Sequence, residues 1–205
     1  MGSVLETINL WASNDTRLKF LQRNQPMVLK WFNQAQLRFA DQAVTLRDIW
    51  TPSIPSSGYI SLPTNFLREF KDRIKRSSGD YVPLQKMKYE DANLVPFSGL
   101  THYSIYNDTF YVWGAMSCNP IIPYVIKPTV ITFANFKTSD LEIDSKYQDN
   151  IVFYMDACYI RSQDGVANTM EAKAMMEAFE RDCDVIATKE QQRLFGSEGT
   201  RGYLI

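Results

Sequence analysis

The chain has 205 residues, with 22 basic and 23 acidic side chains and a formal net charge of −1. This length allows one large domain or two small ones, each with a real hydrophobic core. The near-neutral balance of charge gives no argument for a basic surface that binds nucleic acid or an anionic membrane. Aromatic residues make up 13% of the chain, which favours a core that contains β-structure or large protein–protein interfaces.

The three cysteines, Cys118, Cys158 and Cys183, are widely spaced and odd in number. They match neither a disulfide framework nor a zinc motif, so we expect reduced thiols in a protein made in the cytoplasm. No secretory signal is expected, and no apolar run approaches the ~18 residues that a membrane span needs. Asn14 and Asn107 each begin a glycosylation sequon, which we interpret instead as a helix cap and a hairpin turn.

The first fifty residues predict helices. Residues 4–12 carry apolar side chains at helical spacing, with Ser3 as the N-cap. Residues 13–15 end this helix, and a short helical turn is predicted at 18–21. Pro26 then begins an amphipathic helix of about five turns, as proline does at a first helical position.

The middle of the chain predicts short strands. Residues 51–58 form a loop by composition, and residues 59–62 a strand. Thr64 or Asn65 then caps a brief helix, whose inner face is Phe66, Leu67, Phe70 and Ile74.

A second group of strands follows, at residues 81–88, in a hairpin and at residues 129–133. The hairpin is the clearest signal, because aromatic and β-branched residues alternate at 102–106 and 109–113 on both sides of the pair Asn107-Asp108.

The last third predicts two helices and an arm. Residues 148–162 form the first helix. Asn168 or Thr169 caps the second, which continues to about Arg193. Together these elements predict an α+β protein: a helical domain from residues 1–50 and 147–193, a β-rich insert at 51–146, and an extended C-terminal arm at 194–205.

The arm is the candidate binding segment. Its apolar residues are interrupted by glycines at 196, 199 and 202 that keep the backbone adaptable. Chain ends are usually polar and frayed, so an apolar end is expected to dock on another surface. The candidate docking residues are Leu194, Phe195, Tyr203, Leu204 and Ile205.

No residue set predicts catalysis, a cofactor or a metal site. The single histidine, His102, has no assignable orienting partner or nucleophile, and we interpret it as structural. Asp140, Glu142 and Asp144 alternate like the start of a calcium loop. Ser145 and Ile151, however, stand where that loop needs glycine and glutamate. These carboxylates are therefore interpreted as a solvated edge or a helix-start cluster.

One stretch concentrates basic residues, at positions 68, 71, 73, 75 and 76. Because Glu69 and Asp72 dilute its charge, and because it lies at the end of the predicted short helix, we interpret it as a solvated helix end. A position near phosphates is the alternative.

Several short sequence segments resemble those of the head-to-tail adaptor proteins of tailed bacteriophages, also called connector or tail tubular A-type proteins. They are residues 31–38 (WFNQAQLR), 58–63 (GYISLP), 103–111 (YSIYNDTFY) and 129–133 (TVITF), followed by two closing helices. The likeness is one of layout and short phrases, and it spans roughly residues 1–195.

The resemblance implies a structural virion protein at the head–tail junction. Members of this family form a ring, typically of twelve copies, that joins the portal protein to the distal tail. Genomic DNA passes through the ring without sequence-specific binding. C-terminal segments in the family reach out to the portal, so the arm is expected to enter the portal or a neighbouring subunit. Near-neutral charge fits such a channel, because a basic wall would hold DNA.

Two alternatives remain at this stage. Some relatives in short-tailed phages are associated with peptidoglycan hydrolysis, which needs a carboxylic acid and a second carboxylate. Glu90, Asp91 and Asp108 are available acids, but no pattern marks a pair. The other alternative is a different ring component, such as a tail-completion or baseplate protein.

Overall fold

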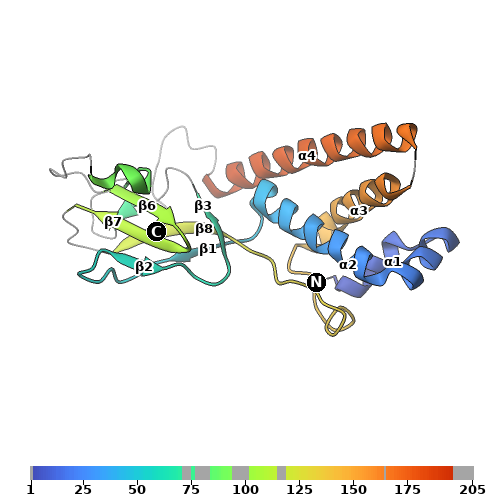
Figure 1. The fold of residues 1–205 in the computed structure, drawn as a ribbon, viewed down its shortest axis with the longest axis horizontal. Helices are drawn as coiled ribbons and strands as arrows, with labels where there is room; N and C mark the ends of the chain where they lie inside the picture. Colours follow the sequence, from blue (N-terminus) through green and yellow to red (C-terminus); the bar gives the residue numbers. More distant parts are fainter. Residues whose placement is uncertain are drawn as a thin grey trace. The chain divides into compact units, whose positions relative to one another are not determined.

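The computed structural model describes residues 2–70, 75–76, 84–93, 102–114, 119–163 and 165–195. The chain forms two compact units (Figure 1). The helical unit combines Met1–Leu46 with Lys127–Ile205, and the β-rich unit is Arg47–Ile126. The predicted α+β class is confirmed: helices come from both ends of the chain, and the strands lie between them in sequence.

Helix α1, Val4–Trp11, begins as predicted at Ser3. The Ser3 hydroxyl accepts a hydrogen bond from the backbone N–H of Glu6 at 3.1 Å, and the Glu6 carboxylate accepts one from the Ser3 N–H at 2.8 Å. This reciprocal capping box satisfies two N–H groups that have no partner within the helix.

Helix α2, Asp15–Ala43, joins the predicted turn and the predicted long helix into one element. Asn14 caps it by accepting a hydrogen bond from the Arg17 N–H at 2.9 Å, as expected. The helix is kinked at Asn24, whose φ of −129° and ψ of 32° are not helical. Pro26 explains the kink, because its ring has no N–H to donate to the preceding turn.

Helices α3, Gln148–Ser162, and α4, Val166–Phe195, close the helical unit. The bounds of α3 are those predicted, but α4 begins earlier than Asn168 or Thr169. The Gly165 carbonyl accepts the first helical hydrogen bond, from the Thr169 N–H at 3.2 Å. Gly165 therefore occupies the cap position, and its φ of 135° suits a residue without a Cβ.

The core of the helical unit gathers side chains from all four helices, among them the fully buried Trp11, Phe32, Met155 and Phe179. Four residues of the segment between the β-rich unit and α3 join this core: Ile131, Phe136, Leu141 and Ile143. Residues 127–146, which the sequence analysis placed in the β-rich insert, therefore pack with the helices. Of the stretch 129–133, for which a strand is predicted, Ile131 is buried against the helices instead of in a sheet.

The β-rich unit contains two sheets. In the first, β8 (Pro120–Ile126) lies between β1 (Arg47–Trp50) and β3 (Phe66–Glu69) and also pairs with β4 (Lys75–Arg76). The second has the order β2 (Tyr59–Ser61), β7 (Thr109–Trp113), β6 (His102–Tyr106) and β5 (Gln85–Lys86). All pairs are antiparallel except β5 with β6. Side chains of both sheets form one core, including Ile122, Trp50, Phe110 and Tyr103.

The predicted hairpin is confirmed as β6 and β7. Asn107 and Asp108 at its turn have φ values of 47° and 55°. Two positive φ values define the type I′ turn, whose twist matches that of the flanking strands. The register pairs Tyr103 with Val112 and Ile105 with Phe110, so these four side chains share the face that packs into the core.

Two predicted elements were wrong: the brief helix after Thr64 or Asn65 and the strand at residues 129–133. The brief helix predicted after Thr64 or Asn65 is strand β3, because β8 offers it antiparallel hydrogen bonds and Phe66 stacks on Tyr124 at 5.2 Å. Residues 129–133 form no strand; the strand of this region is β8, just before them. Of the strand predicted at 81–88, the described part contains Gln85–Lys86 as β5, and residues 81–83 lie outside the described residues.

Candidate interaction surfaces

The end of α4 and the arm after it form the candidate site of the sequence analysis. Helix α4 continues through Leu194 and Phe195, so these two residues belong to the helix and not to an extended arm. The physical reason is that Arg193 and Leu194 favour helix, and the first helix-breaking residue, Gly196, comes after them. Tyr203, Leu204 and Ile205 lie outside the described residues.

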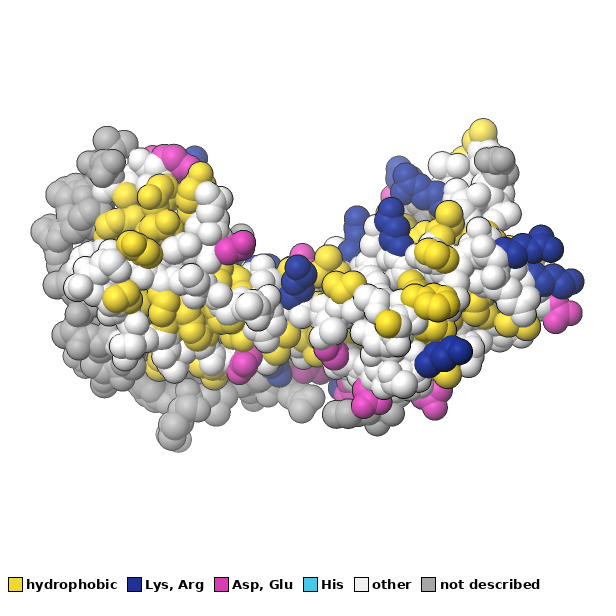
Figure 2. Space-filling view, turned by 60° about the horizontal axis from the view of Figure 1, so that its bottom comes forward, with side chains coloured by type: hydrophobic (Ala, Val, Ile, Leu, Met, Phe, Trp, Pro, Cys, Tyr) yellow, Lys and Arg dark blue, Asp and Glu magenta, His cyan; other side chains and the backbone are white. Residues whose placement is uncertain are grey.

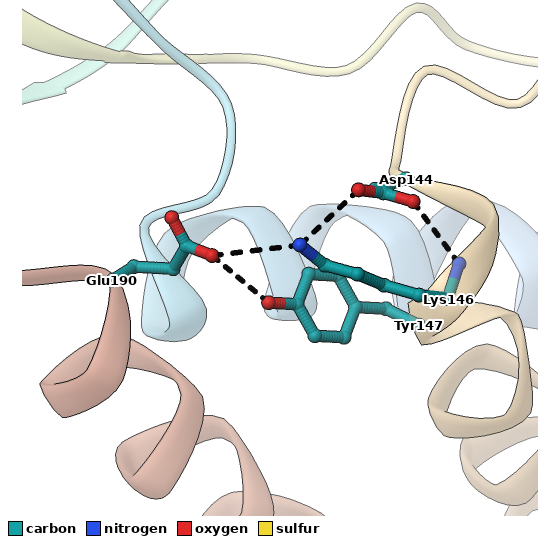
Figure 3. Close-up of polar contacts among 4 residues, drawn as sticks. All are labelled: Asp144, Lys146, Tyr147 and Glu190. Atoms are coloured by element: carbon teal, nitrogen blue, oxygen red, sulfur yellow. Dashed lines mark hydrogen bonds and ion pairs between the residues drawn. The ribbon is translucent and has the colours of Figure 1, made fainter. Parts of the chain in front are cut away.

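The last turns of α4 are fixed to the start of α3 by a polar cluster around Glu190 (Figure 3). Glu190, only 9% exposed, accepts a hydrogen bond from the Tyr147 hydroxyl at 3.0 Å. The Lys146 ammonium lies 3.7 Å from the same carboxylate oxygen and 3.2 Å from the Asp144 carboxylate. Asp144 also accepts the backbone N–H of Lys146 and so caps the short 3-10 helix η2, Ser145–Tyr147.

The pKa values in this cluster shift in the directions that its contacts dictate. Burial, followed by the hydrogen bond to Glu190, raises the pKa of Tyr147. The hydrogen bond from the Lys146 backbone lowers the pKa of Asp144. The hydrogen bond to Asp144 raises the pKa of Lys146. The last two shifts favour the charged forms of Asp144 and Lys146, which suits a contact that holds the end of a helix in place.

The three alternating carboxylates have separate partners. Asp144 caps η2, Glu142 accepts the backbone N–H of Thr129 at 3.1 Å, and Asp140 forms a β-bridge with Ser3. Among the described residues, no group of three or more histidine, cysteine, aspartate or glutamate side chains is arranged to hold a metal ion. All three are exposed, in agreement with the alternative of a solvated edge, and Asp144 alone of the three caps a helix start.

The remaining sequence candidates are dispersed in the β-rich unit. His102 begins β6 opposite Trp113. Glu90 and Asp91 lie on the 3-10 helix η1, Tyr89–Asn93, whereas Asp108 lies in the hairpin turn.

The described basic residues of the stretch 68–76 lie in strands and not at the end of a helix. Arg68 is in β3, Lys75 and Arg76 form β4, and Lys71 and Arg73 lie outside the described residues. A helix dipole therefore does not explain the positions of Arg68, Lys75 and Arg76.

A surface that the sequence analysis did not single out lies on the loop between β8 and α3. Two of its side chains are among the most exposed apolar ones: Val130 is 58% and Phe133 is 68% exposed. Beside them, Leu37 of α2 and residues 127–130 line a hollow of about 130 Å³. Figure 1 shows this loop projecting from the helices near the N-terminus.

A second such surface is the outer face of the sheet β2-β7-β6-β5, opposite the side that packs into the core. We call it the aromatic face and define it by Tyr59, Tyr89, Tyr106, Tyr111 and Trp113. Tyr89 of η1 stacks on Tyr106 at 4.8 Å with an interplanar angle of 6°, and lies 4.6 Å from Tyr111. Tyr111 in turn contacts Tyr59 across the strand pair at 5.8 Å and stacks on Trp113 at 5.9 Å.

The aromatic face is partly open to solvent. Tyr59, Tyr89 and Tyr106 are 52%, 38% and 43% exposed. Figure 2 shows hydrophobic side chains, a class that includes tyrosine, gathered over the β-rich unit, while lysine and arginine side chains are dispersed over the helical unit. The pKa of Tyr111 is raised, first by desolvation and then by the neighbouring Tyr89 hydroxyl.

A groove of about 420 Å³ borders the aromatic face between η1 and β6. It is lined by Lys86, Lys88, Tyr89, Glu90, Ser104 and Tyr106, among others. Lys86 also forms an ion pair with the buried Glu69 of β3. The groove thus combines planar apolar rings with hydrogen-bonding groups, as small-ligand sites do, and its volume lies in their usual range.

The aromatic hairpin was predictable from the sequence, but this face was not. The alternation of Tyr106, Tyr111 and Trp113 with core residues was visible as a two-residue period. The position of Tyr89 over them was not, because it depends on the parallel pairing of β5 with β6.

Comparison with known proteins gives no identification: no protein-family model matches the chain, and no curated protein sequence is significantly similar to it. Within the part of the chain that the structure describes, no helix combines the length and apolar character needed to cross a membrane.

Proposed function

We propose that the protein is a head-to-tail adaptor of a tailed bacteriophage, assembled as a ring of copies between the portal protein and the distal tail. The observation that carries this proposal is the layout of the chain. A helical unit built from both chain ends holds an inserted β-rich unit, and an apolar C-terminal segment follows the last helix. This is the order of elements on which the sequence resemblance rests.

In the proposed ring, the helical unit packs between neighbouring copies and against the portal. The β-rich unit provides the contact with the distal tail, and DNA passes through the channel without sequence-specific contacts. A net charge of −1 supports this last point, because a wall that neutralised many phosphates would hold the DNA in place.

The C-terminal segment provides a tether in this proposal. Burying Tyr203, Leu204 and Ile205 stabilises a contact by ~1.5–3 kcal/mol per side chain. Fixing the backbone costs ~1–2 kcal/mol for each residue that becomes ordered. The net affinity of one arm is therefore modest, and a ring that presents many arms at once gains its strength from their number.

The Glu190 cluster supports this role mechanically. Because Tyr147 and Lys146 fix the last turns of α4, the arm starts from a defined point on the helical unit. A fixed starting point limits the volume that the arm explores, which raises its effective concentration near a nearby socket.

The test is assembly with a portal. The full chain is co-expressed with the portal protein of the same phage, and purified complexes are imaged by electron microscopy so that copies around the axis are counted. We expect a ring with about twelve copies on the portal. A chain that stays monomeric with the portal and is absent from assembled particles would contradict the proposal.

The arm is tested with two variants. The first ends at Phe195, and the second keeps the full length but replaces Tyr203, Leu204 and Ile205 by serine. Both are expected to fold with unchanged circular dichroism and to fail in portal binding. The matched control replaces Ser197 and Thr200 of the same segment by alanine and is expected to bind normally.

A further inference from the structure

The aromatic face is unusual for the solvent side of a small sheet. Large apolar side chains that remain exposed and contiguous mark a binding surface more often than single exposed ones do. Here the stacked pair Tyr89 and Tyr106 leaves ring surface open, beside a groove of about 420 Å³. From this arrangement we propose that the aromatic face and its groove bind a short, uncharged carbohydrate chain. The proposal is independent of ring assembly.

The charges around the groove select an uncharged ligand. Lys86 is already paired with the buried Glu69. Of the remaining charged groups, Lys88 and Glu90 have opposite sign and both line the groove. A single-stranded nucleic acid needs a positively charged groove along its backbone in addition to stacking rings. Its phosphates would meet Glu90 and, next to it, the exposed Asp91.

The shape of the ligand follows from the rings. A sugar ring presents a flat C–H face and a rim of hydroxyl groups. Tyr89 and Tyr106 stack on each other at 4.8 Å and 6°, so each ring covers one face of the other; the C–H face of a sugar matches the outer ring surface that this pair leaves exposed. Stacking on aromatic rings with preformed geometry costs little conformational entropy, because each tyrosine has only two side-chain torsions to fix.

The hydroxyl rim has matching partners in the same groove. Lys88 donates hydrogen bonds, Glu90 accepts them, and the hydroxyl groups of Tyr89 and Tyr106 do both. A neutral polyhydroxylated ligand satisfies donors and acceptors together. A purely apolar ligand would leave these polar groups without partners at a cost. This mixture therefore favours a carbohydrate over a lipid tail.

The test uses the purified full chain and a panel of neutral hexasaccharides with defined linkages: cellohexaose, chitohexaose and maltohexaose. Binding is measured by isothermal titration calorimetry and by changes in amide NMR signals. We expect at least one of the three to bind with millimolar affinity or better, with the NMR changes confined to β5, η1, β6 and β7.

Variants assign the binding to the face. Tyr106→Ala and Tyr89→Ala are expected to weaken binding at least tenfold, whereas Tyr106→Phe, which keeps the ring, is expected to retain it within threefold. Lys88→Ala leaves the rings untouched and is expected to weaken binding three- to tenfold. The matched control is Phe133→Ala, which removes a ring of the helical unit that is even more exposed than Tyr106 and is expected to leave binding unchanged. Thermal melting of each variant confirms that it is folded.

Three results would overturn the proposal. The first is that none of the hexasaccharides binds at a concentration of about 10 mM. This concentration is on the order of ten times a millimolar Kd, a margin of about 1.4 kcal/mol in binding free energy. The second is that binding survives Tyr106→Ala in a folded protein. The third is that the aromatic face has a different occupant. Either it binds oligo-dT, or the full chain self-associates and Tyr106→Ala abolishes the self-association. The face would then be a nucleic-acid site or a contact between copies.

Discussion

The side-chain amide of Asn33 makes both hydrogen bonds to the backbone of Ile131. Its Nδ2 donates to the Ile131 carbonyl at 2.7 Å, and its Oδ1 accepts from the Ile131 N–H at 2.8 Å. A neighbouring β-strand would make the same pair of bonds. The Asn33 side chain thus makes the hydrogen bonds that a neighbouring strand would make and holds the loop before α3 against α2. The Ile131 side chain packs into the helical core.

Asn33→Ala is therefore expected to lower the free energy of unfolding by about 2 kcal/mol, because it leaves a buried N–H and a buried carbonyl without partners. Urea unfolding measures the change. The control is Gln34→Ala, at the exposed neighbouring position, where a change within about 0.5 kcal/mol is expected. Equal effects of the two substitutions would contradict the role assigned to Asn33.

The hairpin turn offers a stabilising substitution. Asp108 has a φ of 55°, a conformation that glycine adopts at no steric cost, and Asn-Gly is the preferred type I′ pair. Asp108→Gly relieves a left-handed backbone cost of about 1–2 kcal/mol and adds unfolded-chain entropy of about 0.4–1 kcal/mol, so a net stabilisation is expected, whereas Asp108→Ala is expected to destabilise the protein. Hydrogen exchange at the amides of β6 and β7 should slow in the first variant and quicken in the second. The same exchange rates in both would show that the turn conformation does not limit the hairpin.

The Tyr147–Glu190 hydrogen bond is expected to hold the end of α4. Tyr147→Phe removes the hydroxyl and should cost about 1 kcal/mol, with faster amide exchange in the last described turns of α4. Glu190→Gln keeps an acceptor for Tyr147 and loses the charge attraction to Lys146, so a smaller effect is expected. Gln192→Ala, at an exposed position nearby, serves as the control. Unchanged exchange in Tyr147→Phe would argue against the anchor.

Alkaline pH is expected to destabilise the protein through its buried thiols. Burial raises the pKa of Cys158 from 9.0 to about 11 and that of Cys183 from 9.0 to about 12. The unfolded chain therefore loses these protons near pH 9, while the folded chain keeps them. Because the folded state binds more protons above pH 9, the free energy of unfolding falls as the pH rises from about 9 to 12.

This pH effect is checked by urea unfolding at pH 8, 9, 10 and 11. Cys183→Ala should make the decline shallower, with a loss of about 1 kcal/mol at pH 8 from the small cavity. Thr188→Ala, on an exposed face of the same helix, should leave the decline unchanged. Burial also raises the pKa of Tyr154, so part of the decline above pH 10 remains in the cysteine variant.

The elements that were predictable are those whose signals are local. Ser3 with Glu6, Asn14, and the Asn107-Asp108 turn each act within three or four residues, so their capping and turn chemistry can be read from the sequence. The elements that failed depend on distant partners. Residues after Asn65 form a strand because β8 lies beside them, and Ile131 forms none because Asn33 already occupies its backbone groups.

The same distinction between local and distant signals applies to the candidate surfaces. The apolar character of the C-terminal segment is visible in composition, but the end of α4 at Phe195 follows from how far the helix propagates before Gly196. The aromatic face could be predicted as an aromatic hairpin, whereas its groove needs η1 folded over β6, a contact between residues distant in sequence.

The pairing of β1 with β8 has a further consequence. Arg47, where the chain leaves the helical unit, lies opposite Val125, two residues before it returns at Lys127. The β-rich unit therefore begins and ends on two paired strands, so its two connections to the helical unit leave from neighbouring positions. A different small domain with the same spacing between its ends could take its place, and a short linker could replace it altogether. The helical unit could in this way keep its fold while the unit inserted between Leu46 and Lys127 is exchanged.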